Sequence, residues 1–293
     1  MNNNNDINED EIRVIGKKSP SPTPPKPFVW WVLGILISLL LLLLVFLFLI
    51  RPRIGQAGEK QPSTPTASAV LTEDLSVNDE WVSTYDENHP AEILFRDTLV
   101  NHIPLTILTP FNTKAELCVG LFDTNDADIL LATQAADIRH DNGKIVGAFV
   151  CKGEPKAWGL SKKGYCAIFD DRITVGTADN SPYFEQATEE DGYFFRQYPL
   201  VDHGKAVNNN PENESQRRAL CQWQGQIHVI VCKERITMND FSKALEQLGI
   251  HNAIYLVGST AYGYAINPDG VKYYFGTPNA RKLSNANYIL FRK

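Results

Sequence analysis

Residues Arg217 to Gly270 have the sequence RRALCQWQGQIHVIVCKERITMNDFSKALEQLGIHNAIYLVGSTAYGYAINPDG, in which apolar runs alternate with polar turns. The run from Gln226 to Cys232 is rich in Ile and Val. It is apolar on both faces of the pleat apart from His228, which is typical of a buried strand. A second run of this kind extends from Asn252 to Val257 and ends in a polar turn.

The segment between these two runs has the signals of a helix from about Met238 to Leu248. Thr237 is a suitable N-cap, and Gly249 stands where a left-handed C-cap is wanted. Between the caps, apolar residues recur at helical spacing: Phe241, Ala244, Leu245 and Leu248. We therefore expect a strand, a helix and a strand, with the two strands parallel in one sheet and joined by a right-handed crossover.

The rest of the C-terminal part contains more strand than helix. The Ala- and Leu-rich segment from Ala127 to Ala136 suggests a short helix, whereas Asp170-Asp171 and Asn267 to Gly270 are typical hairpin turns. Strands are predicted at Ile103 to Leu108, Glu116 to Phe122, Lys144 to Cys151, Tyr165 to Phe169, Ile173 to Gly176, Tyr193 to Leu200, Tyr262 to Ile266, Val271 to Phe275 and Asn287 to Phe291. The predicted fold class is α+β, a mixed twisted β-sheet with a βαβ unit near the C-terminus.

Several short patterns in this region occur together in one known family. Arg217, with Arg218 as a one-residue alternative, precedes the first buried run, and the second closes in Leu256-Val257-Gly258-Ser259-Thr260. Gln197 to Lys205, QYPLVDHGK, lies upstream, and Gly147-Ala148-Phe149 lies further upstream. In order and hydrophobic pattern, about Ala115 to Tyr274 resembles the phosphodiester glycosidase family, which includes the enzyme that uncovers mannose 6-phosphate by removing N-acetylglucosamine.

The resemblance implies a site for a sugar phosphodiester or glycan at the end of the second buried run. A guanidinium offers parallel donors to two phosphate oxygens, and a polar turn can add further donors around the same anion. The alternative is that Arg217 and Arg218 are solvated charges at a strand edge and that Ser259 and Thr260 form an ordinary turn that binds nothing. The residues implied in binding are Arg217, Arg218, Gln197, Ser259, Thr260 and His203, and no catalytic residue is assigned.

The closing signature departs from the family at its acidic position. Members of the family have L-D-G-G-G-S, and Val257 stands where they have Asp. Glycoside hydrolysis normally uses two carboxyl groups, although a phosphate leaving group makes the acid less essential. Val257 can supply neither, and Asp202, Glu234 or Asp269 could substitute only if the fold brings one to the turn. We therefore expect weak or absent catalysis.

The N-terminal part is organised differently. Residues 1–27 are polar and rich in Asn, Ser and Pro, and we expect a disordered cytoplasmic tail. Phe28 to Ile50 is an apolar run of about 23 residues, long enough to cross a bilayer core of ~30 Å. A cleaved signal peptide is the alternative, but its apolar core would be shorter and followed by small residues, whereas Arg51-Pro52-Arg53 follows here. We expect a single-pass anchor in the cytoplasmic (inner) membrane.

Beyond the expected anchor, we expect a Pro/Ser/Thr-rich tether and an acidic arm over residues 51–90, and the domain that resembles the phosphodiester glycosidases over residues 91–293. The short N-terminal tail and the large C-terminal domain favour a domain that faces the periplasm or the exterior. Lys and Arg flank the span on both sides, so charge alone does not set its orientation.

Composition excludes some functions. The formal net charge of −6 gives no basic face for nucleic acid, so no nucleic-acid partner is expected. Five cysteines form no C-x-x-C pair, and the histidines have no second ligand at metal spacing, so neither a metal nor another cofactor is predicted. One disulfide could form in an oxidising compartment. Two function classes stay open: a membrane-anchored hydrolase of a sugar phosphodiester in the cell envelope, and a non-catalytic glycan- or protein-binding envelope module on the same fold.

Overall fold

The computed structural model describes residues 80–277 and 285–293. The predicted tail, the apolar run at residues 28–50 and the tether up to residue 79 lie outside the described residues. Neither helix in the described part of the chain has the length and apolar character that a bilayer crossing requires.

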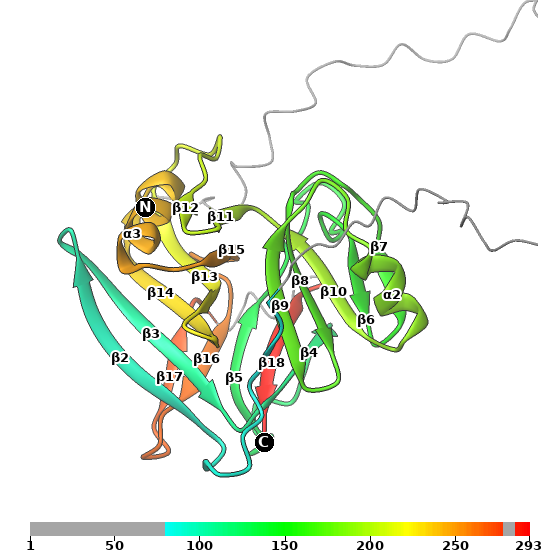
Figure 1. The fold of residues 1–293 in the computed structure, drawn as a ribbon, viewed down its shortest axis with the longest axis horizontal. Helices are drawn as coiled ribbons and strands as arrows, with labels where there is room; N and C mark the ends of the chain where they lie inside the picture. Colours follow the sequence, from blue (N-terminus) through cyan, green and yellow to red (C-terminus); the bar gives the residue numbers. More distant parts are fainter. Residues whose placement is uncertain (1–79, 278–284) are drawn as a thin grey trace, which may run out of the picture. The chain divides into compact units, whose positions relative to one another are not determined.

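Three antiparallel sheets and two helices make up the described domain (Figure 1). The first sheet has the order β1-β9-β8-β10-β6-β7. Its strands are β1 (Val82–Ser83), β6 (Phe149–Cys151), β7 (Glu154–Ala157), β8 (Gly164–Phe169), β9 (Arg172–Thr177) and β10 (Tyr193–Gln197). The short helix α2 (Tyr183–Glu189), which sequence reasoning missed, contacts β6, β8 and β10.

The second sheet has the order β12-β11-β15-β13-β14-β3-β2. Its strands are β2 (Glu92–Val100), β3 (Ile103–Phe111), β11 (Pro199–Asp202), β12 (Lys205–Ala206), β13 (Ser215–Trp223), β14 (Gln226–Ile236) and β15 (Asn252–Leu256). The helix α3 (Met238–Leu248) packs on one face of this sheet through Met238, Phe241, Ala244 and Leu245.

The third sheet has the order β17-β16-β5-β18-β4. Its strands are β4 (Lys114–Val119), β5 (Ile129–Gln134), β16 (Gly263–Ile266), β17 (Lys272–Phe275) and β18 (Asn287–Arg292). Every strand pairing in the described residues is antiparallel. The prediction of one mixed sheet is therefore wrong: the fold is mostly β, in three sheets.

The predicted strand–helix–strand unit is confirmed, but a further strand, β13, lies between its two strands. β14 and β15 both pair antiparallel with β13, so they run in the same direction within one sheet, and α3 joins them. β13 lies between them, however, and they are not hydrogen-bonded neighbours. The helix begins and ends as predicted, because Thr237 Oγ1 accepts a hydrogen bond from the backbone N–H of Asp240 and Gly249 closes the helix at φ 86°.

The segment from Ala127 to Ala136 contradicts its predicted helix. It forms β5, whose six residues are all buried between β16 and β18. Ala and Leu favour helices only weakly, and a segment buried on both faces of a sheet overrides that preference. Two predicted strands are also shorter than expected: Lys144 to Cys151 yields only β6, and Tyr193 to Leu200 divides into β10 and β11, which belong to different sheets.

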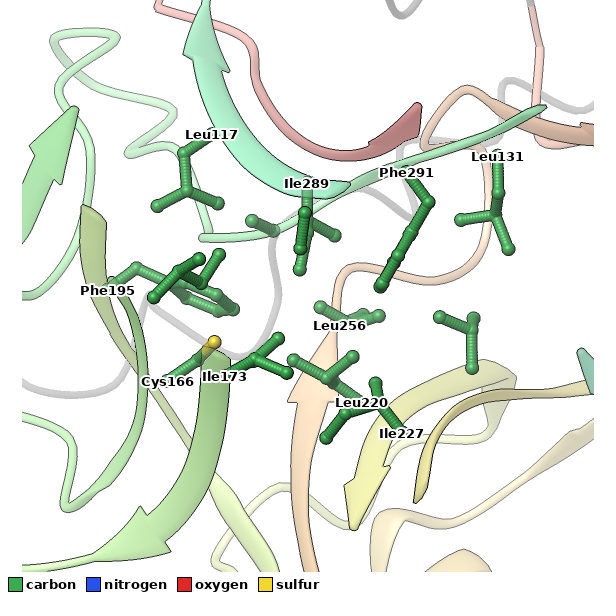
Figure 2. Packing of buried hydrophobic residues seen from close by; sticks show 14 of the residues in the cluster. Leu117, Leu131, Cys166, Ile173, Phe195, Leu220, Ile227, Leu256, Ile289 and Phe291 are labelled. Atoms are coloured by element: carbon green, nitrogen blue, oxygen red, sulfur yellow. The ribbon is translucent and has the colours of Figure 1, made fainter. Parts of the chain in front are cut away.

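The central core draws side chains from all three sheets (Figure 2). Leu131, Ile289 and Phe291 of the third sheet face Leu220 and Leu256 of the second, and all five are at most 1% exposed. Cys166, Ile173 and Phe195 complete the core from the first sheet. Burial of this apolar surface supplies most of the favourable free energy of folding. The packing of Leu256 in this core also fixes the end of β15, which the turn at Ser259 and Thr260 follows.

Residues 80–90, which the sequence assigned to the arm, pack on the domain. The Trp81 ring packs at a tilt against Phe169 and edge-on against Tyr183, with centroid distances of 5.6 and 5.2 Å. Val82 is buried, and β1 pairs with β9. The backbone carbonyl of Glu80 accepts a hydrogen bond of 2.7 Å from Gln222 Nε2. This part of the arm is therefore a structural element of the fold.

Candidate functional site

The two adjacent arginines of β13 project to opposite faces of the second sheet, as successive residues of a strand do. Arg217 lies opposite Cys232 on the face that α3 covers, whereas Arg218 lies opposite Val231 and beside Leu256 on the other face. Both side chains are at most 1% exposed. Arg217 and Arg218, which the sequence offered as alternatives for one phosphate-binding role, thus lie in two different environments.

Arg217 is held inside the structure by neutral acceptors. Its Nε donates to the carbonyl of Ile236 at 3.1 Å, and its Nη2 donates to the backbone and side-chain oxygens of Asn213. The guanidinium also lies 5.8 Å from the centre of the Tyr255 ring and hydrogen-bonds that phenol. This arrangement supports the end of β15 and leaves no open face of the arginine to solvent.

Gln197 belongs to a buried polar group at the end of β10. Its Oε1 accepts from Lys162 Nζ at 2.9 Å, and its Nε2 donates to the carbonyl of Ala135 at 3.4 Å. Lys162, itself only 4% exposed, forms an ion pair with Asp137 and lies 4.3 Å from the centre of the Tyr198 ring. The Asp137 side chain is 18% exposed, so solvent reaches this carboxylate.

Tyr255 connects these residues to the closing turn. Its hydroxyl accepts from the backbone N–H of Gly258 at 3.1 Å. Burial raises the pKa of this phenol; Arg217 acts in the opposite direction, and the negative charge of Asp137 raises it further. Asp137 and Arg217 therefore both lie within electrostatic range of Tyr255. We call Asp137, Lys162, Gln197, Arg217 and Tyr255 the polar cluster.

Arg218 lines a pocket of about 430 Å³ beside the same turn. Its Nη1 donates to the carbonyl of Val257 at 3.1 Å and to Thr133 Oγ1 at 3.4 Å, and its Nη2 donates to the carbonyl of Ala261 at 2.8 Å. Phe275 stacks on the guanidinium at 4.8 Å. We call this the basic pocket; its polar and aromatic lining includes Arg218, Lys233, Arg235, Ser259, Thr260 and Tyr274.

The turn between the polar cluster and the basic pocket is tightly fixed. A Cβ added to Gly258 would lie 2.0 Å from the carbonyl oxygen of Gln216. Ser259 adopts a positive φ of 49°, and its backbone N–H donates to the same carbonyl at 3.0 Å. The carbonyl of Thr260 accepts from the backbone N–H of Thr277 at 2.9 Å. These contacts direct Ser259 and Thr260 to the basic pocket.

Comparisons with known proteins bear on this arrangement. A model of the phosphodiester glycosidase family matches residues 124–290, more than half of the chain. The chain belongs to the phosphodiester glycosidase family. The match spans β5 to β18 and includes both the polar cluster and the basic pocket, so the family resemblance is confirmed.

Two solved structures are similar to this family member. The zebrafish N-acetylglucosamine-1-phosphodiester alpha-N-acetylglucosaminidase catalytic domain, auto-inhibited by its pro-peptide, superposes with a TM-score of 0.51 at 13% identity over 73% of this chain and 87% of that chain. A hypothetical protein from Synechocystis gives a TM-score of 0.48 at 13% identity over 69% and 62%. The zebrafish likeness shows a shared fold. No curated protein matches this sequence significantly.

The predicted convergence of four residues in this family member holds only in part. Ser259 and Thr260 lie together at the end of β15, but Arg218, rather than Arg217, shares their pocket. Gln197 belongs to the polar cluster with Lys162 and Asp137. The physical reason for the division is the pleat of β13, which places consecutive arginines on different faces.

His203 does not belong to either group. It lies in the turn between β11 and β12, where its backbone N–H bonds the side chain of Asn252 at 3.0 Å and its ring bonds Asp202 at 2.8 Å. Asn252 begins β15, whereas Ser259 follows the end of that strand. A strand rises ~3.3 Å per residue, so His203 lies roughly 15 Å or more from the turn. The structure thus places His203 apart from both groups, and its role in binding stays a prediction.

The carboxylates proposed as substitutes for position 257 lie elsewhere as well. Asp202 pairs with His203 at the far end of β15, Asp269 lies in the hairpin between β16 and β17, and Glu234 does not line the basic pocket. Asp137 is the carboxylate that sequence reasoning missed. It follows β5, whose Gln134 accepts the backbone N–H of Val257 at 3.2 Å. The sequence marks Asp137 only by its place directly after the apolar segment Ala127 to Ala136, which was predicted to be a helix.

The cysteines of the described residues are poor candidates for nucleophiles, including Cys232, which lines the basic pocket. All five cysteines are free, and burial raises the pKa of each thiol, to about 12 for Cys118. A thiol with a raised pKa is a poor nucleophile at neutral pH. Within residues 80–277 and 285–293, no group of three or more His, Cys, Asp or Glu side chains is arranged to hold a metal ion.

Proposed function

We propose that this family member binds a sugar phosphodiester at the polar cluster and hydrolyses it slowly or not at all. The observation that carries the proposal is the combination of Val257 at the acidic position with a single carboxylate, Asp137, in the cluster. That carboxylate forms an ion pair with the buried Lys162. One carboxyl group, engaged in this pair, is fewer than glycoside hydrolysis normally uses.

The ligand class follows from the family and from the groups that the cluster presents. Hydrolysis of a sugar phosphodiester adds water across the bond between the anomeric carbon and the phosphate oxygen, which yields a free sugar and a phosphomonoester. Asp137 is partly open to solvent and could accept hydrogen bonds from sugar hydroxyls. Lys162 pairs with Asp137 and donates a hydrogen bond to Gln197, which fixes the ammonium group beside the carboxylate. The cluster therefore offers hydrogen-bonding groups for a sugar, but it supplies only one carboxyl group for hydrolysis.

Equilibrium binding of an aryl phosphodiester of N-acetylglucosamine, measured by calorimetry, tests this proposal. Asp137→Asn keeps the shape of the side chain but removes its charge and one acceptor, and we expect affinity to fall roughly three- to tenfold. Asp141→Asn is the matched control, because Asp141 is exposed and paired with Arg139 outside the cluster. Unchanged affinity in Asp137→Asn would show that the polar cluster is not the binding site.

An active hydrolase is the second candidate, and Asp137 is the observation that favours it. A phosphate is a good leaving group, so one partly exposed carboxylate acting as base or nucleophile could suffice. The two candidates differ in turnover. A rate of roughly 1 s⁻¹ or more, lost in Asp137→Asn, would establish the active enzyme.

We further propose that residues 28–50 anchor the chain in the cytoplasmic membrane, with the domain facing the periplasm or exterior and the ligand part of the cell envelope. The support is the length of the apolar run and the Arg-Pro-Arg that follows it in place of a cleavage site. Protease added to spheroplasts should remove an epitope placed after Lys293. Protection of that epitope, or a mature N-terminus beyond Arg53, would contradict this topology.

A further inference from the structure

The outer edge of β2 is the longest open strand edge in the described part of the chain. β2 has nine residues and ends the second sheet, and no described strand pairs with its other side (Figure 1). The terminal strands β1, β7, β12 and β17 have only two to four residues, and β4 lies against β6 and β10. An open edge presents unpaired N–H and C=O groups that can pair with a further strand.

The turn between β2 and β3 shows which backbone groups face outward. Its two residues, Asn101 and His102, both have a positive φ, 47° and 66°, as in a type I′ turn. The residues that flank such a turn, Val100 and Ile103, form a hydrogen-bonded pair, and pairs with and without hydrogen bonds alternate along the strands. The backbone groups of every second residue of β2 therefore point away from β3: Ile93, Phe95, Asp97 and Leu99.

Two prolines of β3 agree with this assignment. Pro104 lies opposite Leu99, and Pro110 lies opposite Ile93. Because proline has no N–H group, neither pair can exchange both hydrogen bonds. β2 itself contains no proline, and its nine pairs with β3 follow one register without a bulge. Neither of these two devices therefore blocks the edge of β2.

The two charged residues in the middle of β2 are directed back toward the sheet. The guanidinium of Arg96 lies 5.3 Å from the centre of the Trp223 ring, which belongs to β13, beyond β3 and β14. The carboxylate of Asp97 accepts a hydrogen bond of 2.7 Å from Thr106 Oγ1 in β3. Apolar side chains of β2 remain exposed on both of its faces: Leu94 at 41% and Leu99 at 64%.

We propose that a second copy of this chain pairs with this edge through its own β2, antiparallel and related by a twofold axis. Such an axis requires that one residue of β2 lies opposite its own copy. When that residue is Arg96, Ile93 lies opposite Leu99 of the second copy and Phe95 lies opposite Asp97. This register satisfies all outward groups with about eight hydrogen bonds, whereas a register centred on Phe95 or Asp97 forms about six.

The same register suits the side chains of β2. It places the exposed Leu99 beside Ile93 of the second copy and Leu94 beside Thr98, and cross-strand pairs of apolar and β-branched residues stabilise a sheet. The two Arg96 side chains start at the axis, but the contact with Trp223 draws each guanidinium toward its own sheet. β2 belongs to neither the polar cluster nor the basic pocket. The pairing therefore stands whether or not the polar cluster binds a phosphodiester.

Cysteine cross-linking of the full-length chain in mild detergent tests this pairing. Arg96→Cys places a thiol at the axis, where opposed Cβ atoms lie about 5 Å apart. Leu94→Cys, the matched control, places a thiol on the same face of β2 but roughly 13 Å from its copy. With copper phenanthroline as oxidant, we expect a disulfide-linked dimer on non-reducing gels for Arg96→Cys. We expect none for Leu94→Cys or for the wild type, which reports on the native cysteines.

A second pair of variants tests the backbone, each combined with Arg96→Cys. Asp97→Pro removes one outward N–H, which an edge strand tolerates, and should lower the yield of dimer roughly fivefold or more. Asp97→Ala removes the same carboxylate but keeps the N–H, so the yield should stay unchanged. Absence of a dimer in Arg96→Cys, equal cross-linking of Leu94→Cys, or an undiminished yield with Asp97→Pro would overturn the proposal.

Discussion

Arg217 and Arg218 are neighbours in β13, yet one guanidinium packs on Tyr255 at 5.8 Å and the other on Phe275 at 4.8 Å. Their side chains support the same turn from its two sides, through Tyr255 and Gly258 in one case and through the carbonyls of Val257 and Ala261 in the other. One strand of this family member thus contributes to both the polar cluster and the basic pocket.

Arg218 should be needed for the stability of the turn after β15. Arg218→Met removes hydrogen bonds to Val257 and Ala261, and we expect a loss of about 2 kcal/mol in the free energy of unfolding, measured by urea denaturation. Lys243→Met, at an exposed lysine of α3, is the control and should change stability by less than about 0.5 kcal/mol. Equal stability of the two variants would show that Arg218 does not support the turn.

Gly258 should tolerate no side chain. A Cβ at this position would lie 2.0 Å from the carbonyl of Gln216, which is backbone and cannot move without disturbing β13. We expect Gly258→Ala to lower the free energy of unfolding by about 2 kcal/mol or more, measured by urea denaturation. Gly159→Ala provides the control, because its Cβ would meet its nearest neighbour at 3.4 Å. A Gly258→Ala variant as stable as this control would mean that the turn is looser than described.

His228 should make stability depend on pH below neutrality. Burial lowers the pKa of its imidazole to about 4, and the ring hydrogen-bonds Thr109 and the carbonyl of Trp223. Because the unfolded chain binds a proton at about pH 6.5 and the folded one does not, stability falls as pH decreases from about 6.5 to 4. The loss should be about 3 kcal/mol.

Urea denaturation at a series of pH values checks this dependence. His228→Gln should flatten the slope between pH 6.5 and 4, because Gln does not titrate. His102→Gln should keep the wild-type slope, since His102 is exposed. A slope that is the same in all three proteins would assign the acid sensitivity to other groups.

Trp81 should contribute to the stability of the domain even though it precedes the predicted boundary. Its ring contacts Phe169 and Tyr183, and the Arg172 guanidinium lies 5.8 Å from its centre. We expect Trp81→Ala in the full chain to lower the free energy of unfolding by about 2–3 kcal/mol. Trp158→Ala, at a ring that is 73% exposed, should cost less than about 0.5 kcal/mol. Similar costs in thermal melts would place residues 80–90 outside the cooperative unit.

The parts of the fold that depend on local signals could be predicted from the sequence. Thr237 and Gly249 fix both ends of α3 through contacts with residues three or four positions away, and Asn267 to Gly270 forms its predicted hairpin. The order of strands depends on contacts far apart in the chain. For that reason, the insertion of β13 between β14 and β15 and the conversion of Ala127 to Ala136 into a buried strand were not predictable from short patterns.

Of the candidate site, only the turn at Ser259 and Thr260 could be predicted from the sequence. Ser259 and Thr260 lie where expected. The pleat of β13 separates Arg217 from Arg218, and an irregularity of the register between Gln216 and Arg217 precedes them. A shift of one residue in a strand moves a side chain to the other face, and no sequence pattern marks this one. Asp137 escaped notice because its partner Lys162 lies 25 residues away and each residue alone resembles a surface charge.

The most direct test of the proposed function is the rate at which the full-length chain releases N-acetylglucosamine from its aryl phosphodiester, compared between the wild type and Val257→Asp. We predict a wild-type turnover well below ~1 s⁻¹ and a rise of at least tenfold in Val257→Asp, because the substitution restores a carboxylate at the turn. Val257→Asn, which is similar in size but uncharged, should show no rise. A wild-type turnover of about 1 s⁻¹ or more, or equal rates in all three proteins, would contradict the account.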